Sequence, residues 1–331
     1  MNYFIGSLLL LCTLLGCSDP FVAQAQKRYV LSEERVLDGK LSHDGEWAAL
    51  VMEGPSVNIW DVRSKKVVFS LAKEALPTTI RTFLFNKQHR LIIVAGSNVL
   101  QLWDINTGNL EGTLNVSGFD ELARITTLQL SLDARLVGIG MTDGSVTLFN
   151  RENKQARRIV PHTSNVTHIH FLPDNIGVLS AAHDGYVKAW AMDEGNTLYS
   201  VRYPSRISTL SVARTGNDMF VSDSLKTQQV LNVSNGKLSK QLDYMSRFKW
   251  FRHALFLSGS PYLLTSSPKS ELTVWHMSSG KEVLSWHIEA ESMGTTLFDM
   301  IELSSGRLVT LNSEAVVEHW HTDELLFLGT Q

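Results

Sequence analysis

The sequence predicts an all-β protein, a seven-bladed β-propeller, and three observations lead to this prediction. One bulky residue recurs at intervals of 41 to 46 residues. Between its occurrences lie short runs of alternating apolar and polar residues, such as residues 125–130, which are typical of β-strands. No long segment has the period of an amphipathic helix. The recurring residues are Trp60, Trp103, Phe149, Trp190, Leu231, Trp275 and Trp320. A period in the low forties, with four short strands per period, is typical of a propeller blade, and seven positions predict seven blades.

The turn after the recurring residue supports this interpretation. In four of the repeats a glycine stands five residues after it, at Gly108, Gly195, Gly236 and Gly280. A glycine at a fixed offset supplies the positive φ of a hairpin turn at no steric cost. We therefore expect a tight turn between the third and fourth strands of these blades.

The repeats resemble those of the WD-repeat family, whose blades have four antiparallel strands. Residues 60–61 and 103–104 match the Trp-Asp dipeptide that names the family, and the fourth repeat, residues 161–190, matches best. The resemblance implies a buried, hydrogen-bonded tetrad. Its members here would be His162, Ser180, Asp184 and Trp190, and only the fourth repeat has all four.

Closure of the ring leaves two alternatives. Residues 28–31 and residues 325–328 both read as an outer strand of the seventh blade. A propeller commonly closes by pairing strands from both chain ends within one blade. We expect one of these segments to take that place, and the other to form an extra edge strand or to stay loose.

The N-terminal segment resembles the signal peptide of a bacterial lipoprotein. An apolar run over residues 5–15 is too short to span a bilayer comfortably, and it ends in the lipobox-like Leu14-Leu15-Gly16-Cys17. The resemblance implies that residues 1–16 are removed and that Cys17 carries the acyl chains. Residues 17–27 would then form a tether and residues 28–331 the propeller. The alternative is an ordinary secretory signal that is cut near Ala23 or Ala25.

The residue that follows Cys17 bears on localisation. It is Ser18 rather than Asp, which in lipoproteins implies the outer membrane, facing the periplasm. The chain has two cysteines, Cys12 and Cys17, both in this segment, so the globular part needs no disulfide and has no thiol chemistry. The formal net charge is −3, with both signs interspersed, and no basic stretch suggests nucleic-acid binding.

A candidate partner-binding segment joins the fifth and sixth repeats. It contains Arg247, Phe248, Lys249 and Trp250, the densest mixture of basic and aromatic residues in the chain. Exposed Trp, Phe and Arg are good interface anchors. The alternative is that Trp250 or Phe251 begins the first strand of the sixth blade and packs between blades.

Catalytic and metal-binding motifs are sparse. The sequence has no Gly-x-Ser-x-Gly, His-Glu-x-x-His or phosphate-binding glycine loop. His168 with His170, and His319 with His321, have a spacing that can chelate zinc, but no third ligand is evident. We therefore expect no catalytic residues, no metal and no cofactor.

These features favour a non-catalytic, lipid-anchored scaffold for protein–protein interaction in the bacterial cell envelope, linked to envelope or outer-membrane assembly. Its partners would be envelope proteins, and acyl chains on Cys17 would hold it at the membrane. One alternative is a periplasmic propeller enzyme, similar to lactonases or dehydrogenases, with its site at the central channel. A cluster of inward carboxylates, histidines or asparagines from several blades in the central channel would favour that enzyme. The other alternative is a binder of cell-wall polymer or carbohydrate.

Overall fold

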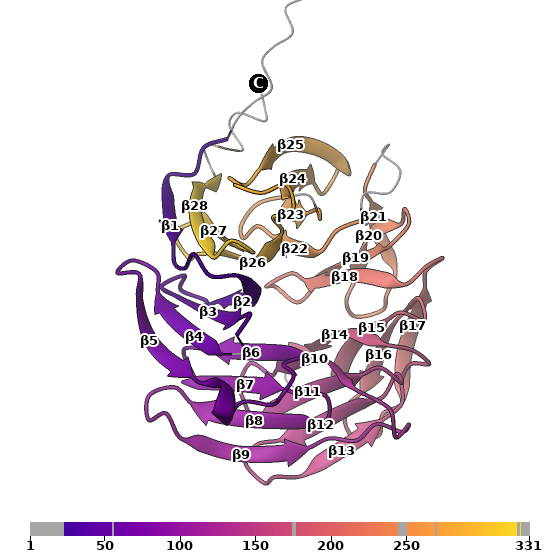
Figure 1. Ribbon diagram of the computed structural model, residues 1–331. Helices are drawn as coiled ribbons and strands as arrows, with labels where there is room; N and C mark the ends of the chain where they lie inside the picture. The colour runs from indigo at the N-terminus through magenta and orange to yellow at the C-terminus, as the bar shows by residue number, and fades with distance from the viewer. Residues whose placement is uncertain are drawn as a thin grey trace, which may run out of the picture.

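The strands assemble into seven four-stranded antiparallel sheets arranged around a central axis, a seven-bladed β-propeller (Figure 1). The computed structural model describes residues 23–54, 56–173, 177–243, 250–268, 270–322 and 325. Cys17 lies outside these residues. Within them, no helix has the length and apolar character needed to cross a membrane.

Each blade runs from an inner strand at the axis to an outer strand at the rim. The first blade is β2 (Val36–Leu41), β3 (Trp47–Met52), β4 (Val57–Asp61) and β5 (Lys66–Leu71). After the short 3-10 helix η1 (Lys73–Ala75), the second is β6 (Thr82–Asn86), β7 (Leu91–Ala95), β8 (Val99–Asp104) and β9 (Leu110–Asn115). The third is β10 (Ile125–Leu130), β11 (Leu136–Met141), β12 (Val146–Asn150) and β13 (Ala156–Ile159). The fourth is β14 (Val166–Phe171), β15 (Gly177–Ala182), β16 (Tyr186–Ala191) and β17 (Thr197–Arg202).

The remaining blades follow the same order until the last strand. The fifth is β18 (Ile207–Val212), β19 (Asp218–Asp223), β20 (Gln228–Asn232) and β21 (Leu238–Gln241). The sixth is β22 (His253–Phe256), β23 (Tyr262–Ser266), β24 (Glu271–His276) and β25 (Lys281–His287). The seventh is β26 (Leu297–Glu302), β27 (Arg307–Asn312), β28 (Val316–His321) and, as its outer strand, β1 (Lys27–Val30).

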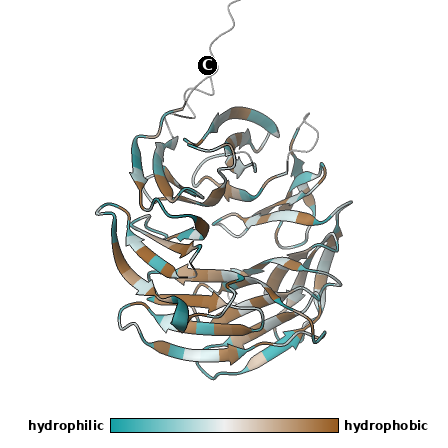
Figure 2. Cartoon of the chain, viewed as in Figure 1, coloured by the Kyte–Doolittle hydropathy of each residue, from teal (hydrophilic) through white to brown (hydrophobic). Residues whose placement is uncertain are grey.

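The recurring bulky residue occupies the third strand of every blade, as the sequence predicts. Trp190, Trp275 and Trp320 are among the largest fully buried side chains of the protein. The second strands are the most apolar part of each blade, and every residue of β7 is buried. In Figure 2 the hydrophobic colour accordingly concentrates on strands, while many of the connecting turns are hydrophilic. The core therefore lies between neighbouring blades.

The turn after the third strand has positive φ in six blades. Gly108 and Gly280 have φ of 73° and 75°, as expected for the glycines at this offset. In the first and third blades a lysine holds the same place, with φ of 56° at Lys65 and 59° at Lys154. The backbone geometry is thus kept even where the sequence lacks the glycine.

The N-terminal strand closes the ring. β1 pairs antiparallel with β28, with Arg28 opposite Glu318 in the register. The side chain of Arg28 also forms ion pairs with Glu289 at 3.4 Å and Glu291 at 3.2 Å, both in the loop that leads to the seventh blade. Leu325, from the competing segment, lies outside any strand and packs in the same buried cluster as Ala23.

Candidate functional site at the central channel

The inner strand of each blade carries one polar residue at the same register position. In the fourth blade, His168 pairs with Ala181, three residues beyond Val178, which itself pairs with the recurring Trp190. The same relation holds in every blade. The residues at this level, here called the polar ring, are Asp38, Thr82, Thr127, His168, Thr209, His253 and Asp299.

A signal for the polar ring is present in the sequence, as a fixed spacing rather than a recurring residue type. Each ring residue stands 21 or 22 residues before the recurring bulky residue of its blade. Five of the seven inner strands also carry a β-bulge directly before it, as between Val166 and His168. A bulge bends the strand and re-aims the side chain that follows. The bulge explains why the ring position could not be derived from simple alternation along the strand.

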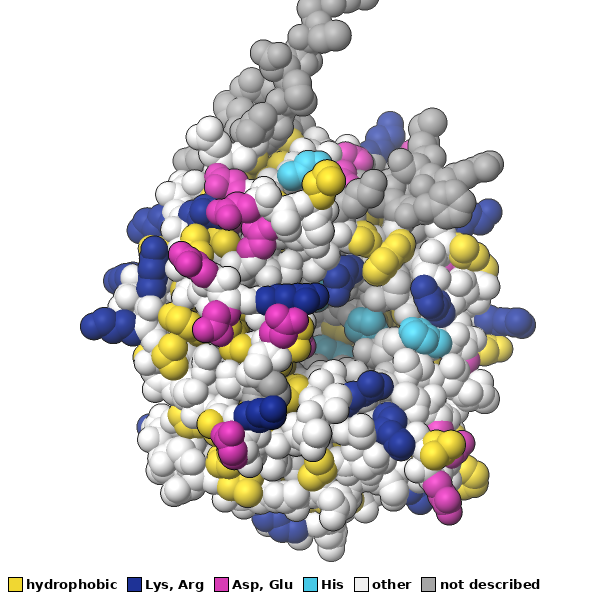
Figure 3. Space-filling view, in the orientation of Figure 1, with side chains coloured by type: hydrophobic (Ala, Val, Ile, Leu, Met, Phe, Trp, Pro, Cys, Tyr) yellow, Lys and Arg dark blue, Asp and Glu magenta, His cyan; other side chains and the backbone are white. Residues whose placement is uncertain are grey.

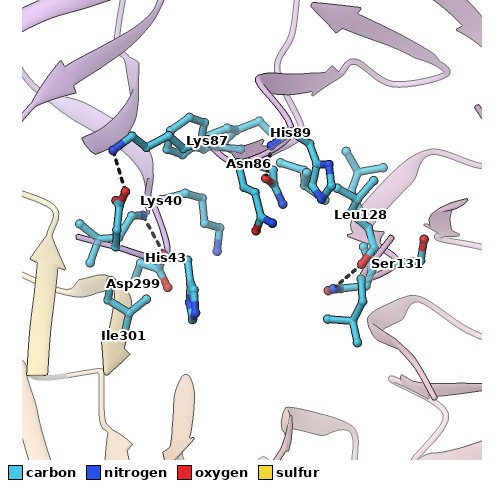
Figure 4. A pocket seen from close by; sticks show the side chains of 18 residues that line it. Lys40, His43, Asn86, Lys87, His89, Leu128, Ser131, Asp299 and Ile301 are labelled. Atoms are coloured by element: carbon cyan, nitrogen blue, oxygen red, sulfur yellow. Dashed lines mark hydrogen bonds and ion pairs between the residues drawn. The ribbon is translucent and has the colours of Figure 1, made fainter. Parts of the chain in front are cut away.

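Two cavities open into the channel from opposite ends. We call the end at which the inner strands begin the upper face, and the end at which they finish the lower face. The lower cavity has a volume of about 910 Å³, and Gln129 and Asp299 are among its lining residues (Figure 4). The upper cavity has a volume of about 330 Å³, and Asp38 and His253 line it. Lys40 lines both cavities, so its side chain lies where they approach each other.

The two ring carboxyls have different partners. Asp299 accepts hydrogen bonds from the backbone N–H of Leu41 at 2.9 Å and of Met300 at 3.0 Å, and the first of these joins the seventh blade to the first. Asp38 accepts one from the N–H of Gly39 at 2.8 Å. Burial raises the pKa of both carboxyls above the ordinary value, while the positive charge of Lys40 opposes this rise.

The two ring histidines are neutral at physiological pH. Burial, reinforced by the charge of Lys40, lowers the pKa of His168 to about 4 and that of His253 to about 3. Each neutral imidazole offers one N–H donor and one acceptor nitrogen. In Figure 3, histidine side chains lie around a hollow near the middle of the ring. The channel therefore presents uncharged hydrogen-bonding groups beside an ammonium and two carboxyls.

The arrangement does not form a metal site in the described part of the chain. No group of three or more His, Cys, Asp or Glu side chains there could hold an ion. Of the predicted histidine pairs, His168 and His170 share a face of β14, while His319 packs edge-on against Tyr29, with ring centroids 5.6 Å apart. What the channel can do chemically is form hydrogen bonds and ion pairs with a polar ligand.

The structure brings the four tetrad residues together in the fourth blade. His162 lies between Asp184, 3.0 Å from its Nδ1, and Ser180, 2.8 Å from its Nε2. Trp190 Nε1 donates to the same Ser180 hydroxyl at 3.0 Å. Although burial opposes it, hydrogen bonding to His162 and to backbone N–H groups holds the pKa of Asp184 below its ordinary value. The chain of bonds thus satisfies the buried indole and links the loop before the blade to its second and third strands.

Other blades keep part of this arrangement, which the tetrad motif did not predict. Trp275 Nε1 donates to Thr265 at 2.9 Å and Trp320 Nε1 to Thr310 at 3.1 Å, so a threonine replaces the serine. In the first two blades the residue of the second strand that would accept this indole hydrogen bond is apolar. The buried indole nitrogens of Trp60 and Trp103 consequently have no hydrogen-bond partner among the described residues.

The candidate partner-binding segment is described only at its end. Arg247, Phe248 and Lys249 lie outside the described residues, while Trp250 is 38% exposed. Phe251 is fully buried, and its ring centroid lies 5.9 Å from those of both Phe220 and Trp275. Each alternative thus holds for one of two adjacent residues. Phe251 packs between blades, whereas Trp250 faces solvent, where a partner could contact it.

Exposed apolar side chains are unevenly distributed over the described surface. On the upper face or its loops they are Leu37, Phe119, Leu122, Val160, Leu225, Trp250 and Met293. On the lower face Leu132 is the one large exposed apolar residue of the described chain, and the others lie on the outer strands. The two ends of the ring therefore differ in apolar character.

Comparison with known proteins supports a propeller of WD-repeat type. The family model of the WD domain, G-beta repeat, matches residues 153–191, which include β13 of the third blade and β14, β15 and β16 of the fourth. Autophagy-related protein 16 of Arabidopsis thaliana is 23% identical over 257 residues, covering 73% of this chain and 50% of that protein. Apoptotic protease-activating factor 1 of Danio rerio is 22% identical over 285 residues, covering 72% of this chain and 22% of that protein.

A third relative matches over more of its own length. Target of rapamycin complex subunit wat1 of Schizosaccharomyces pombe is 19% identical over 226 residues, covering 66% of this chain and 71% of that protein. The chain spans half or less of the other two relatives. Together with the seven four-stranded blades, these similarities support a propeller of WD-repeat type.

Proposed function

We propose that this protein is a non-catalytic scaffold whose upper face binds partner proteins of the bacterial cell envelope. The observation that carries the proposal is the uneven distribution of exposed apolar side chains. Phe119 and Leu122 are 80% and 75% exposed, in one loop of the upper face, and Met293 is fully exposed in another. Clustered exposed apolar residues mark interaction sites. The similarity to a protein named as a complex subunit agrees with this role.

We propose further that Cys17 carries acyl chains and holds the ring at the outer membrane, facing the periplasm. Ala23 is buried in the cluster that contains Trp320, so the chain is packed on the seventh blade from that residue onward. Only five residues separate Cys17 from Ala23, which allows a span of at most about 20 Å. Such a short connection would confine the ring near the membrane and raise its effective concentration for membrane-bound partners.

In-cell cross-linking of the tagged full-length protein, followed by mass spectrometry, tests the scaffold role. The variant Phe119→Ser/Leu122→Ser removes apolar area from the upper face, and Leu132→Ser, at a site that is 90% exposed, is the matched control on the lower face. We expect a reproducible envelope partner that the double variant loses and the control keeps. A partner retained by both, or no specific partner at all, contradicts the proposal.

The polar ring favours a second candidate, an enzyme with its site in the channel. Carboxyls and neutral imidazoles from several blades meet there, which is the arrangement that such a site requires. Lactone hydrolysis or dehydrogenation that is lost in His253→Gln would support an enzyme. Purified protein that contains no metal and catalyses neither lactone hydrolysis nor dehydrogenation would favour the scaffold.

A further inference from the structure

Three cationic side chains line the upper cavity. Lys40 comes from β2, Arg81 from the residue before β6, and Arg252 from the residue before β22, and all three line the same cavity. Within the described residues none of them forms an ion pair or a side-chain hydrogen bond. Elsewhere on the molecule, Arg28 and Lys87 are each paired with two carboxylates. The mouth thus brings together three cations with no carboxylate of the described residues in ion-pair contact, although the charges of Lys40 and Arg252 act on Asp38.

The charge of the cavity is positive on balance. Asp38 is the one carboxyl among its lining residues, against three cations. Asp299, the other ring carboxyl, already accepts two backbone hydrogen bonds and lines the lower cavity. Outside the cavity, burial lowers the pKa of His183, and the positive charge of Arg206 beside it lowers this pKa further. An anion entering from the upper face would meet a favourable potential.

The uncharged groups of the cavity complement the cations. Thr82 adds a hydroxyl that can hydrogen-bond to an oxygen atom, and beside it His253 is a neutral imidazole that hydrogen-bonds to the backbone of Leu297. Leu37, Ile80 and Phe298 line the same cavity and provide an apolar wall. A volume of about 330 Å³ lies at the lower end of the range of small-molecule sites.

We propose that the upper mouth of the channel binds a small molecule bearing an oxyanion, either a carboxylate or a phosphate group. Lys40 holds the charged group as a point charge inside the channel, and the planar guanidinium groups of Arg81 and Arg252 bind its oxygens at the rim. The body of the ligand rests against the apolar wall. This site is independent of the scaffold role, because it needs neither the exposed apolar loops nor a protein partner.

Titration calorimetry with inorganic phosphate, citrate and neutral glucose tests this site. We expect one saturable site for phosphate or citrate and none for glucose. The single variants Lys40→Gln, Arg81→Gln and Arg252→Gln should each weaken binding about tenfold or more, because each removes a charge-assisted contact. Lys66→Gln, an exposed lysine on the outer strand β5, removes the same charge elsewhere and should bind as the parent does.

The phosphate and citrate titrations identify which oxyanion is preferred, and saturable binding of either supports the site. Binding that does not saturate, or that survives all three variants, overturns it. Binding of a poly-glutamate peptide alone, with neither small anion, also overturns it and assigns the mouth to an acidic segment of a partner. Circular dichroism checks that each variant folds. If Lys40→Gln does not fold, the variant Arg81→Gln decides the case, because Arg81 is exposed.

Discussion

Glu318 makes the stability of the ring depend on pH. It lies on β28 with none of its surface exposed, opposite Arg28 of the closing strand. Its Oε1 accepts the backbone N–H of Glu289 at 3.0 Å, and its Oε2 accepts the hydroxyl of Thr310 at 3.4 Å. The same Thr310 hydroxyl accepts the indole N–H of Trp320. The carboxyl is therefore hydrogen-bonded but removed from water.

Burial raises the pKa of Glu318 from 4.5 to about 7, and the negative charge of Glu289 adds to the rise. The hydrogen bonds and the charge of Arg28 offset it only in part. Because the folded protein holds this proton more tightly than the unfolded chain, protonated Glu318 stabilises the fold. That stabilisation is complete below the unfolded pKa and is lost as the pH rises through about 7. The shift corresponds to about 3 kcal/mol at alkaline pH.

The variant Glu318→Gln removes the charge and keeps an oxygen for the N–H of Glu289. We expect it to melt about 5 °C above the parent at pH 8, from about 3 kcal/mol and the usual unfolding entropy of a chain this long. At pH 5, only half a pH unit above the unfolded pKa, most of the stabilisation is still present, and the gap should shrink to about a quarter of its value at pH 8. Scanning calorimetry from pH 5 to pH 8 measures this gap.

The control is Glu282→Gln, which changes an exposed glutamate on β25. Its melting temperature should follow that of the parent at every pH. A gap between Glu318→Gln and the parent that is the same at pH 5 and pH 8 would refute the reasoning. So would a parent that is more stable than the variant at pH 8, since the ionised carboxyl would then be favourable.

Three further predictions concern the tetrad, the turns and the anchor. Asp184→Ala leaves His162 half-paired and should destabilise the protein by about 1–3 kcal/mol; an unchanged denaturation midpoint would show that the tetrad contributes nothing. Lys65→Gly relieves a left-handed φ of 56° and should stabilise by roughly 0.5–1 kcal/mol, whereas Lys66→Gly beside it, within β5, should destabilise. Cys17→Ala should abolish labelling with a radioactive fatty acid and release the protein from the membrane fraction; if labelling and attachment both persist, the anchor lies elsewhere.

The blades could be predicted because one large side chain must fill the interior of each. Trp190, Trp275 and Trp320 are fully buried, so the packing requirement repeats with the blade and leaves a regular trace in the sequence. The turn at Lys65 could not be predicted, because lysine has no preference for positive φ. There the neighbouring strands impose the backbone conformation.

The polar ring escaped prediction for a different reason. Its members share a position but no residue type, since Asp38, Thr82 and His168 are equivalent by register alone. A pattern search that asks for recurring chemistry passes over such a set. Ring closure was equally undetermined, because residues 28–31 and 325–328 are both apolar enough for an outer strand. The ion pairs of Arg28 with Glu289 and Glu291 provide a specific attachment for the first of them.

The charged members of the channel gather where the ring closes. Asp38 and Lys40 belong to the first blade and Asp299 to the seventh, and the hydrogen bond from the N–H of Leu41 to Asp299 joins these blades on the inner side. On the outer side of the seventh blade, Arg28 forms ion pairs with Glu289 and Glu291. A ligand bound to Lys40 would thus contact the junction at which the two ends of the propeller meet. Occupation of the upper mouth should for this reason stabilise the closed ring as a whole, because a ligand that binds only the folded state raises its stability.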